Sequence, residues 1–157
     1  MLTAFLDYYR AALLDRTFGL DQQQLATPLA PSSLTIGGLI GHMTFVEYVW
    51  YRVRFAGHDM PEPFASLDWD ENPDAEMALA ESWPTEHLLE AFDEAIRDSR
   101  QRVKNAASLD DLSELNRNSD REKWNLRWIM IHMIEEYARH CGHADLIRES
   151  IDGDVCQ

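Results

Sequence analysis

The sequence predicts an all-α fold, an up-down-up-down four-helix bundle, from three observations. Four long segments carry apolar residues at the spacing of three and four that marks one face of a helix. No segment sustains the alternation of apolar and polar residues that a half-buried strand requires. The chain has 157 residues, 45% of them hydrophobic, which is enough for one substantial core. We therefore expect a single domain over residues 1–157.

The first predicted helix covers residues 2–19. Gly19 suits its end, because glycine takes up the left-handed backbone conformation without a steric penalty. One stripe of this helix is expected to face the core, and it consists of Phe5, Tyr9, Ala12, Leu13 and Arg16.

The second predicted helix follows a proline-containing connection and runs to Phe55, where Ala56-Gly57 ends it. Ser33 or Thr35 is the expected N-cap, since a hydroxyl there can accept a backbone hydrogen bond. A glycine inside an isolated helix costs roughly 1 kcal/mol relative to alanine, and this segment has glycines at positions 37, 38 and 41. Close packing against a neighbouring helix would explain them.

The third long helix is expected after an irregular stretch, residues 58–84, that contains a short helix at residues 74–81. It runs from Thr85, its expected cap, to Ala106. Its buried side is expected to consist of Leu88, Leu89, Phe92, Ile96 and Val103. Residues 108–123 then form a second polar loop.

The fourth long helix has the clearest start in the sequence. Asn125 is its expected N-cap, and Trp124 and Ile129 can form a hydrophobic staple across its first turn. The helix continues to residue 151, where Asp152-Gly153 ends it.

Charge and composition narrow the classes of partner. The formal net charge of −14 argues against nucleic acid, because phosphate backbones are bound through clustered lysine and arginine. No stretch approaches the roughly 20 consecutive apolar residues of a membrane-spanning helix, so no membrane partner is expected. The two cysteines, Cys141 in the fourth helix and Cys156 in the C-terminal tail, give no disulfide framework. A reducing cytoplasm is the expected location.

Two ionisable residues lie inside the apolar stripe of the fourth helix. At about 100° per residue, Glu136 falls within roughly 40° of His140, as do Leu126, Ile129, Met133, Ala144 and Ile147. Because Glu136 and His140 are four residues apart, their side chains can converge on one ion. His132 and His143 fall roughly 60–80° to one side, and His132 lies roughly 12 Å from His140 along the axis, too far to share that ion easily.

The third ligand is expected from another helix, and His42 fits. On the second helix it lies within roughly 60° of Leu39, Val46, Val49 and Val53, which places its imidazole on the core-facing stripe. Two histidines and one glutamate with an open position match a catalytic zinc site, and the same set suits ferrous iron. The predicted metal ligands are His42, Glu136 and His140, with zinc favoured and nickel or iron as alternatives.

A simpler interpretation of these residues stays open at this point. A histidine on an apolar stripe is often a hydrogen-bonded core residue rather than a ligand. Glu136 could pair with His42, Arg52 or Arg54, because a buried carboxylate needs a partner of some kind.

Other candidate residues carry weaker signals. Cys141 lies about 100° from His140 around the helix, so we expect a packed thiol rather than a ligand or nucleophile. His58 and His87 fall in a loop and at a helix start, where solvent exposure is expected. Among the tryptophans, Trp69 in its acidic loop is the best placed to line a pocket.

Three segments resemble the DinB/YfiT-like metal-binding four-helix bundles, in particular their small actinobacterial-type branch of unknown function. These segments are residues 39–43, LIGHM, residues 128–145, WIMIHMIEEYARHCGHAD, and residues 146–153, LIRESIDG. The resemblance covers nearly the whole chain and implies the same fold.

The resemblance also implies the ligand set. In that family the metal is usually bound by three histidines, one on the second helix and an i, i+4 pair on the fourth. Here Glu136 takes the first place of the pair, which is similar to the branch that includes the N-terminal domain of mycothiol-dependent maleylpyruvate isomerase. Carried over to this sequence, the ligands are again His42, Glu136 and His140.

The function that the resemblance implies is that of a metal-dependent transferase or isomerase. It would use a low-molecular-weight thiol such as mycothiol, bacillithiol or glutathione, together with a small-molecule substrate, and a homodimer is compatible with the family. A divalent ion lowers the pKa of a bound thiol and keeps its sulfur ionised near neutral pH. Two alternatives stay open: a non-catalytic metal-binding bundle, whose ion consolidates the core, and a hydrolase that uses metal-bound water.

Overall fold

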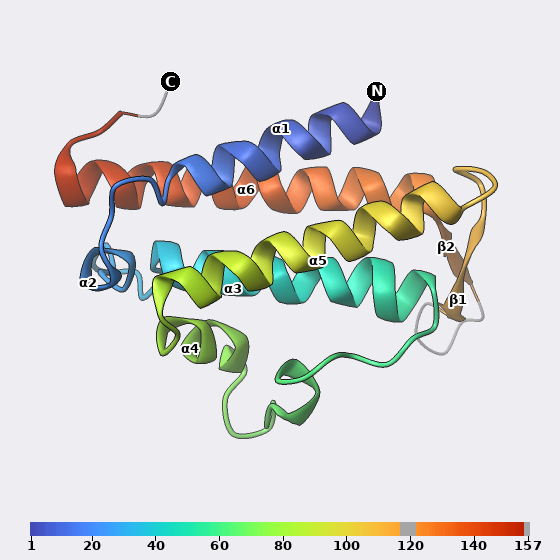
Figure 1. The fold of residues 1–157 in the computed structure, drawn as a ribbon, viewed down its shortest axis with the longest axis horizontal. Helices are drawn as coiled ribbons and strands as arrows, with labels where there is room; N and C mark the ends of the chain where they lie inside the picture. The colour runs from blue at the N-terminus through green and yellow to red at the C-terminus, as the bar shows by residue number, and fades with distance from the viewer. Residues whose placement is uncertain (117–121, 156–157) are drawn as a thin grey trace.

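Within residues 1–116 and 122–155, which the computed structural model describes, four long helical segments form a bundle (Figure 1). They are α1 (Leu2–Asp15), α3 (Ile36–Glu47) with its π-helical continuation η1 (Tyr48–Phe55), α5 (Thr85–Asn105) and α6 (Leu126–Asp152). The connections hold α2 (Gln22–Leu25), the 3-10 turn η2 (Phe64–Ser66), α4 (Ala75–Glu81) and the antiparallel strands β1 (Leu112–Asn116) and β2 (Lys123–Asn125). The predicted helical bundle is therefore confirmed. Among these residues, no helix has both the length and the apolar character needed to cross a membrane.

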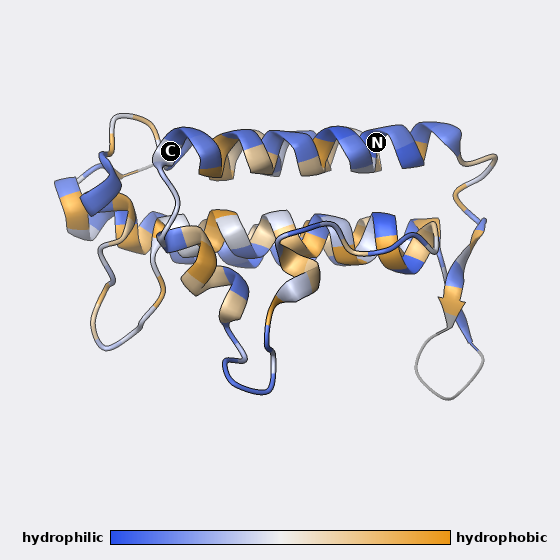
Figure 2. Cartoon of the chain, turned by 60° about the horizontal axis from the view of Figure 1, so that its bottom comes forward, coloured by the Kyte–Doolittle hydropathy of each residue, from blue (hydrophilic) through white to orange (hydrophobic). Residues whose placement is uncertain are grey.

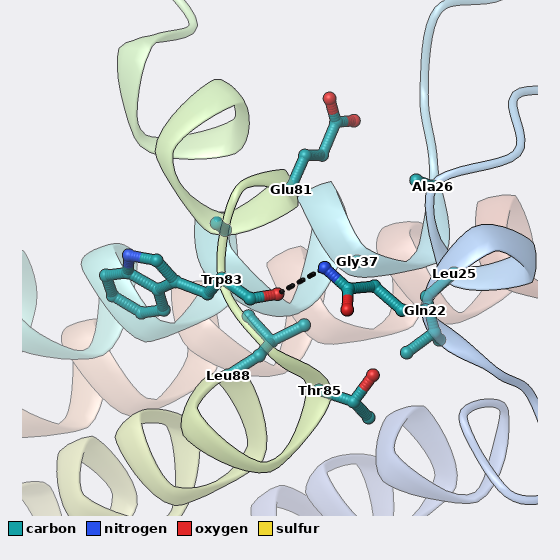
Figure 3. A pocket seen from close by; sticks show the side chains of 9 residues that line it. Gln22, Leu25, Ala26, Gly37, Glu81, Trp83, Thr85 and Leu88 are labelled. Carbon is teal, nitrogen blue, oxygen red and sulfur yellow. Dashed lines mark hydrogen bonds between the residues drawn. The ribbon is translucent and has the colours of Figure 1, made fainter.

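The direction of α5 differs from the up-down-up-down order that the sequence predicts. The start of α5 lies beside the start of α3, because Leu88 and Gly37 line the same small pocket (Figure 3). At the other end, Arg52 of η1 forms an ion pair with Asp98 of α5 at 3.5 Å. The two segments are thus parallel, whereas α1 and α6 run together in the opposite direction (Figure 1). The order is up-down-down-up.

The long connection between η1 and α5 is the physical reason for this order. A short loop would force neighbouring helices to be antiparallel. Residues 56–84 are instead long enough to return along the bundle before α5 begins, and they include η2 and α4. The hydrophilic tip of this connection, between η2 and α4, projects away from the helices (Figure 2).

The core-facing stripe of α1 is shifted from the predicted one. Leu13 is buried and Tyr9 and Ala12 pack against the core, as predicted. Phe5, however, is 51% exposed, and Leu6 and Arg10 are buried in addition. Arg10 can be buried because it pairs with Glu47. The helix itself ends at Asp15, and the left-handed Gly19 (φ 76°) ends the turn that follows.

Two of the three predicted N-cap residues cap their helices in the structure. The Thr35 side chain accepts the Gly38 N–H at 2.9 Å, and Asn125 accepts the Trp128 N–H at 2.8 Å. Thr85 is not a cap but the first residue of α5.

The predicted polar loop at residues 108–123 instead contains most of a β-hairpin, in which Leu112 pairs with Asn125. The buried residue of β1 is Ser113, whose hydroxyl accepts the Trp124 N–H at 3.1 Å, and Leu112 and Leu115 are exposed. An apolar-in, polar-out pattern is therefore missing, which explains why the sequence gives no strand signal. Part of the loop, residues 117–121, lies outside the described residues.

The glycines of α3 do mark close packing, as the sequence predicts. A Cβ added to Gly41 would overlap the Cβ of Ala80 on α4, and one added to Gly37 would lie 3.2 Å from the backbone oxygen of Leu25. Small residues at these positions allow α2 and α4 to approach α3 closely.

A buried ion pair connects three helices in the core. Arg10 of α1 donates two hydrogen bonds to Glu47 of α3, at 2.8 and 2.9 Å, and Tyr137 of α6 donates a third at 2.6 Å. Arg10 is 4% exposed and Glu47 is fully buried. Burial and the adjacent carboxylate raise the pKa of Tyr137, so its hydroxyl keeps the proton that it donates. Each charge is thereby compensated where water cannot reach it.

We predict that Arg10→Met lowers the free energy of unfolding by about 3–5 kcal/mol, because it leaves the Glu47 carboxylate buried without its cation. Urea denaturation monitored by circular dichroism measures this. The matched control is Arg100→Met, which removes an exposed ion pair with Asp7 and should cost at most about 1 kcal/mol. Equal costs for the two variants would contradict the prediction.

Candidate metal centre

His42, Glu136 and His140 come together between α3 and α6. One potential ligand atom from each residue lies within 4.8 Å of the others. His140 Nε2 is 3.4 Å from Glu136 Oε2, and the two imidazole rings meet edge to face with centroids 4.8 Å apart. Among residues 1–116 and 122–155, this is the one group of three or more His, Cys, Asp or Glu side chains placed to hold an ion.

The helices place these side chains by simple geometry. Glu136 and His140 project from successive turns of one face of α6. His42 lies in the regular part of α3, directly after Gly41. Because α3 and α6 are antiparallel neighbours, one side chain from α3 meets two from α6.

The three side chains of the group differ in burial, and burial governs the protonation of His140. His140 is 7% exposed, and burial together with the neighbouring His42, His143 and Arg139 lowers its pKa to about 4. It is therefore neutral at physiological pH, the form in which an imidazole nitrogen can bind a metal. His42 and Glu136 are only half-buried, so the group opens to solvent on their side.

Each imidazole also has a second partner that occupies its Nδ1 atom. His42 Nδ1 lies 2.8 Å from Oε1 of Glu76, a residue of α4. His140 Nδ1 lies 3.4 Å from Nδ1 of His143. These contacts leave Nε2 of both rings available to an ion, and such outer partners are typical of histidine ligands.

Glu76 is the residue of this site that the sequence does not indicate. It is 4% exposed although it belongs to a short helix in a long connection. Its neighbours in sequence show no stripe that separates it from the other acidic residues nearby. Only the packing of α4 against α3 brings it to His42.

His132 stays outside the group, as its position on the helix predicts. Its Nε2 is 3.8 Å from Glu136 Oε1, beyond hydrogen-bonding distance. The ring stacks on Trp128, with centroids 5.0 Å apart, and meets Trp50 at 4.5 Å. Burial lowers its pKa. His132 thus forms an aromatic wall beside the group.

Of the alternative partners for Glu136, the two arginines are engaged elsewhere, whereas His42 lies in the same group. Arg52 pairs with Asp98, and the Arg54 guanidinium lies 4.3 Å from the centroid of Trp50. Glu136 faces Arg139 at 3.8 Å, in addition to the histidines.

The remaining candidates lie outside the group. His58 and His87 are exposed, as predicted. Trp69 packs on Phe45 of α3, with ring centroids 4.8 Å apart, and it lines a surface pocket formed by residues 65–70, as predicted. Cys141 is buried, and Cys156 lies outside the described residues.

Comparison with protein families gives a match over nearly the whole chain. A family model described as mycothiol-S-transferase matches residues 1–153, which is nearly the whole chain. No curated protein matches. The family match agrees with the DinB/YfiT-like resemblance and with the helical bundle described above.

We predict that Cys141 is unreactive in the folded protein. Burial raises the pKa of its thiol to about 11, and the Sγ atom contacts the backbone oxygen of Tyr9 at 3.6 Å. In a Cys156→Ser background, Ellman's reagent at pH 8 should react at least about a hundredfold more slowly with the native protein than with the urea-unfolded protein. Labelling of the native protein at the rate of a free cysteine would show that the thiol is accessible and ionised.

Proposed function

This chain belongs to the mycothiol-S-transferase family, and on that basis we propose that it joins mycothiol, through its sulfur atom, to a small electrophile at a divalent metal centre. The proposed ligands are His42, Glu136 and His140. The observation that carries the proposal is the convergence of these three side chains on a partly exposed side of the bundle.

The donor atoms fit a divalent ion. Two neutral imidazoles and one carboxylate form the ligand set of many catalytic zinc sites, and they also suit nickel or ferrous iron. The Nδ1 contacts to Glu76 and His143 orient both rings in advance. Three protein ligands leave a position for a further ligand, which distinguishes a catalytic site from a closed structural one.

The reaction requires an ionised sulfur and an electrophilic carbon. When bound, a divalent ion supplies a positive charge that lowers the pKa of a thiol and holds it as a thiolate near neutral pH. A C–S bond then forms as the bond from that carbon to its leaving group breaks, and the leaving group departs with the electron pair. The thiol proton passes to solvent.

The chain's own residues favour an external thiol. Cys141 faces Tyr9 of α1, and its raised pKa keeps it protonated. A sulfur nucleophile must therefore come with the substrate, as the family description implies. The half-buried side of the group, at His42 and Glu136, is where such a thiol can enter.

We predict that the parent protein binds about one zinc ion per chain, because its three donors suit one four-coordinate ion. Protein purified without a metal-chelating tag is titrated with zinc in competition with a chromophoric chelator. His42→Ala and Glu136→Ala should each abolish stoichiometric binding. The control is His87→Ala, an exposed histidine that packs on Trp83 and should leave binding unchanged. A parent protein that takes up no zinc, nickel or iron would refute the site.

We predict thiol-dependent turnover by the metal-loaded protein. With a haloarene as the electrophilic acceptor, the parent protein should consume mycothiol faster than the His42→Ala variant does. It should also consume mycothiol faster than glutathione or bacillithiol under the same conditions. Conjugate formation is followed by mass spectrometry. Ester hydrolysis without any thiol would instead indicate a hydrolase, and absence of both activities in metal-loaded protein would indicate a binding protein.

A further inference from the structure

Glu76 is a buried carboxylate with one visible partner. Its Oε1 lies 2.8 Å from His42 Nδ1, while its Oε2 is buried without a hydrogen-bond partner among the described residues. A buried carboxylate is costly unless it is compensated. The packing of α4 alone therefore does not explain why this carboxylate is buried.

Helix α4 is attached to α3 at three successive places. Glu76 contacts His42, and Ala80 fills the space left by Gly41. One residue further on, Glu81 accepts a hydrogen bond from the Thr35 hydroxyl at 2.6 Å. The helix is thus fixed along the first turns of α3, and Glu76 is held against the imidazole.

We propose that Glu76 is the positioning residue of the metal centre. Its carboxylate accepts the Nδ1–H of His42, which selects one tautomer of the ring and directs Nε2 toward the ion. The proposal rests on the metal site of the proposed function and adds to it a residue from outside the four long helices. Glu76 binds no metal itself, and it acts through His42.

The two histidines of the centre are supported unequally. His42 has an anionic partner, Glu76, whereas the partner of His140 is a second imidazole, His143. A carboxylate makes the opposite nitrogen of an imidazole a stronger donor than a neutral partner does. The positive charge of the ion would in turn compensate the buried charge of Glu76. Loss of Glu76 should therefore weaken binding even when the protein stays folded.

The test compares zinc affinity, measured by chelator competition, in the parent, Glu76→Ala and Glu76→Gln. Glu76→Ala should weaken binding roughly 10–100-fold, the usual effect of losing such an outer partner. Glu76→Gln keeps an oxygen acceptor but not the charge, so its affinity should lie between the other two. The matched control is Glu81→Ala, which removes the hydrogen bond between α4 and Thr35 and should retain parental affinity.

A second readout separates positioning from folding. In the zinc-loaded parent, the Nδ1–H proton of His42 should give a slowly exchanging NMR signal, which Glu76→Gln retains and Glu76→Ala loses. Circular dichroism verifies the fold, and Glu76→Gln keeps the test valid if Glu76→Ala does not fold. If Glu76→Ala binds zinc with parental affinity, or if Glu81→Ala loses as much affinity as Glu76→Ala does, the role proposed for Glu76 is overturned while the metal site itself stands. Failure of the parent to bind zinc would overturn the metal site itself.

Discussion

The interaction on which the rest of the structure depends is the buried pair of Arg10 and Glu47. Two charges without access to water require each other, so this pair fixes where α1 lies relative to α3. Tyr137 extends the constraint to α6 by its hydrogen bond to Glu47. Glu136 is the neighbour of Tyr137, and His42 precedes Glu47 on α3. The register that satisfies the ion pair is therefore the one that brings His42 to face Glu136.

The two groups of buried polar residues differ in how completely their charges and hydrogen-bonding atoms are compensated. In the core, Arg10 and Glu47 satisfy each other with short hydrogen bonds. At the candidate metal centre the compensation is partial, since His140 is neutral and one oxygen of Glu76 has no partner among the described residues. In folded proteins, buried polar atoms without a hydrogen-bond partner are found mainly at functional sites.

Sequence alone predicted what depends on neighbours along the chain. The caps at Thr35 and Asn125 and the i, i+4 pair of Glu136 and His140 are local patterns, and the structure bears them out as geometry. The direction of α5, the burial of Arg10 and the contact of Glu76 with His42 depend on segments far apart in sequence. The spacing of apolar residues carries no information about such contacts, so the burial of Arg10 was not predicted and the order of the helices was predicted wrongly.

The parallel arrangement of α3 and α5 has a consequence for how such proteins can diversify. Because of it, the chain must return along the bundle between η1 and α5, through residues 56–84. This crossover contains α4 with Glu76, and it contains Trp69, which packs on Phe45 of α3. The three candidate ligands lie on α3 and α6, while surface connections tolerate change. A crossover that keeps Glu76 can vary at its other positions without rebuilding the ligands, so this architecture lets the surroundings of the site change separately from the ligand set.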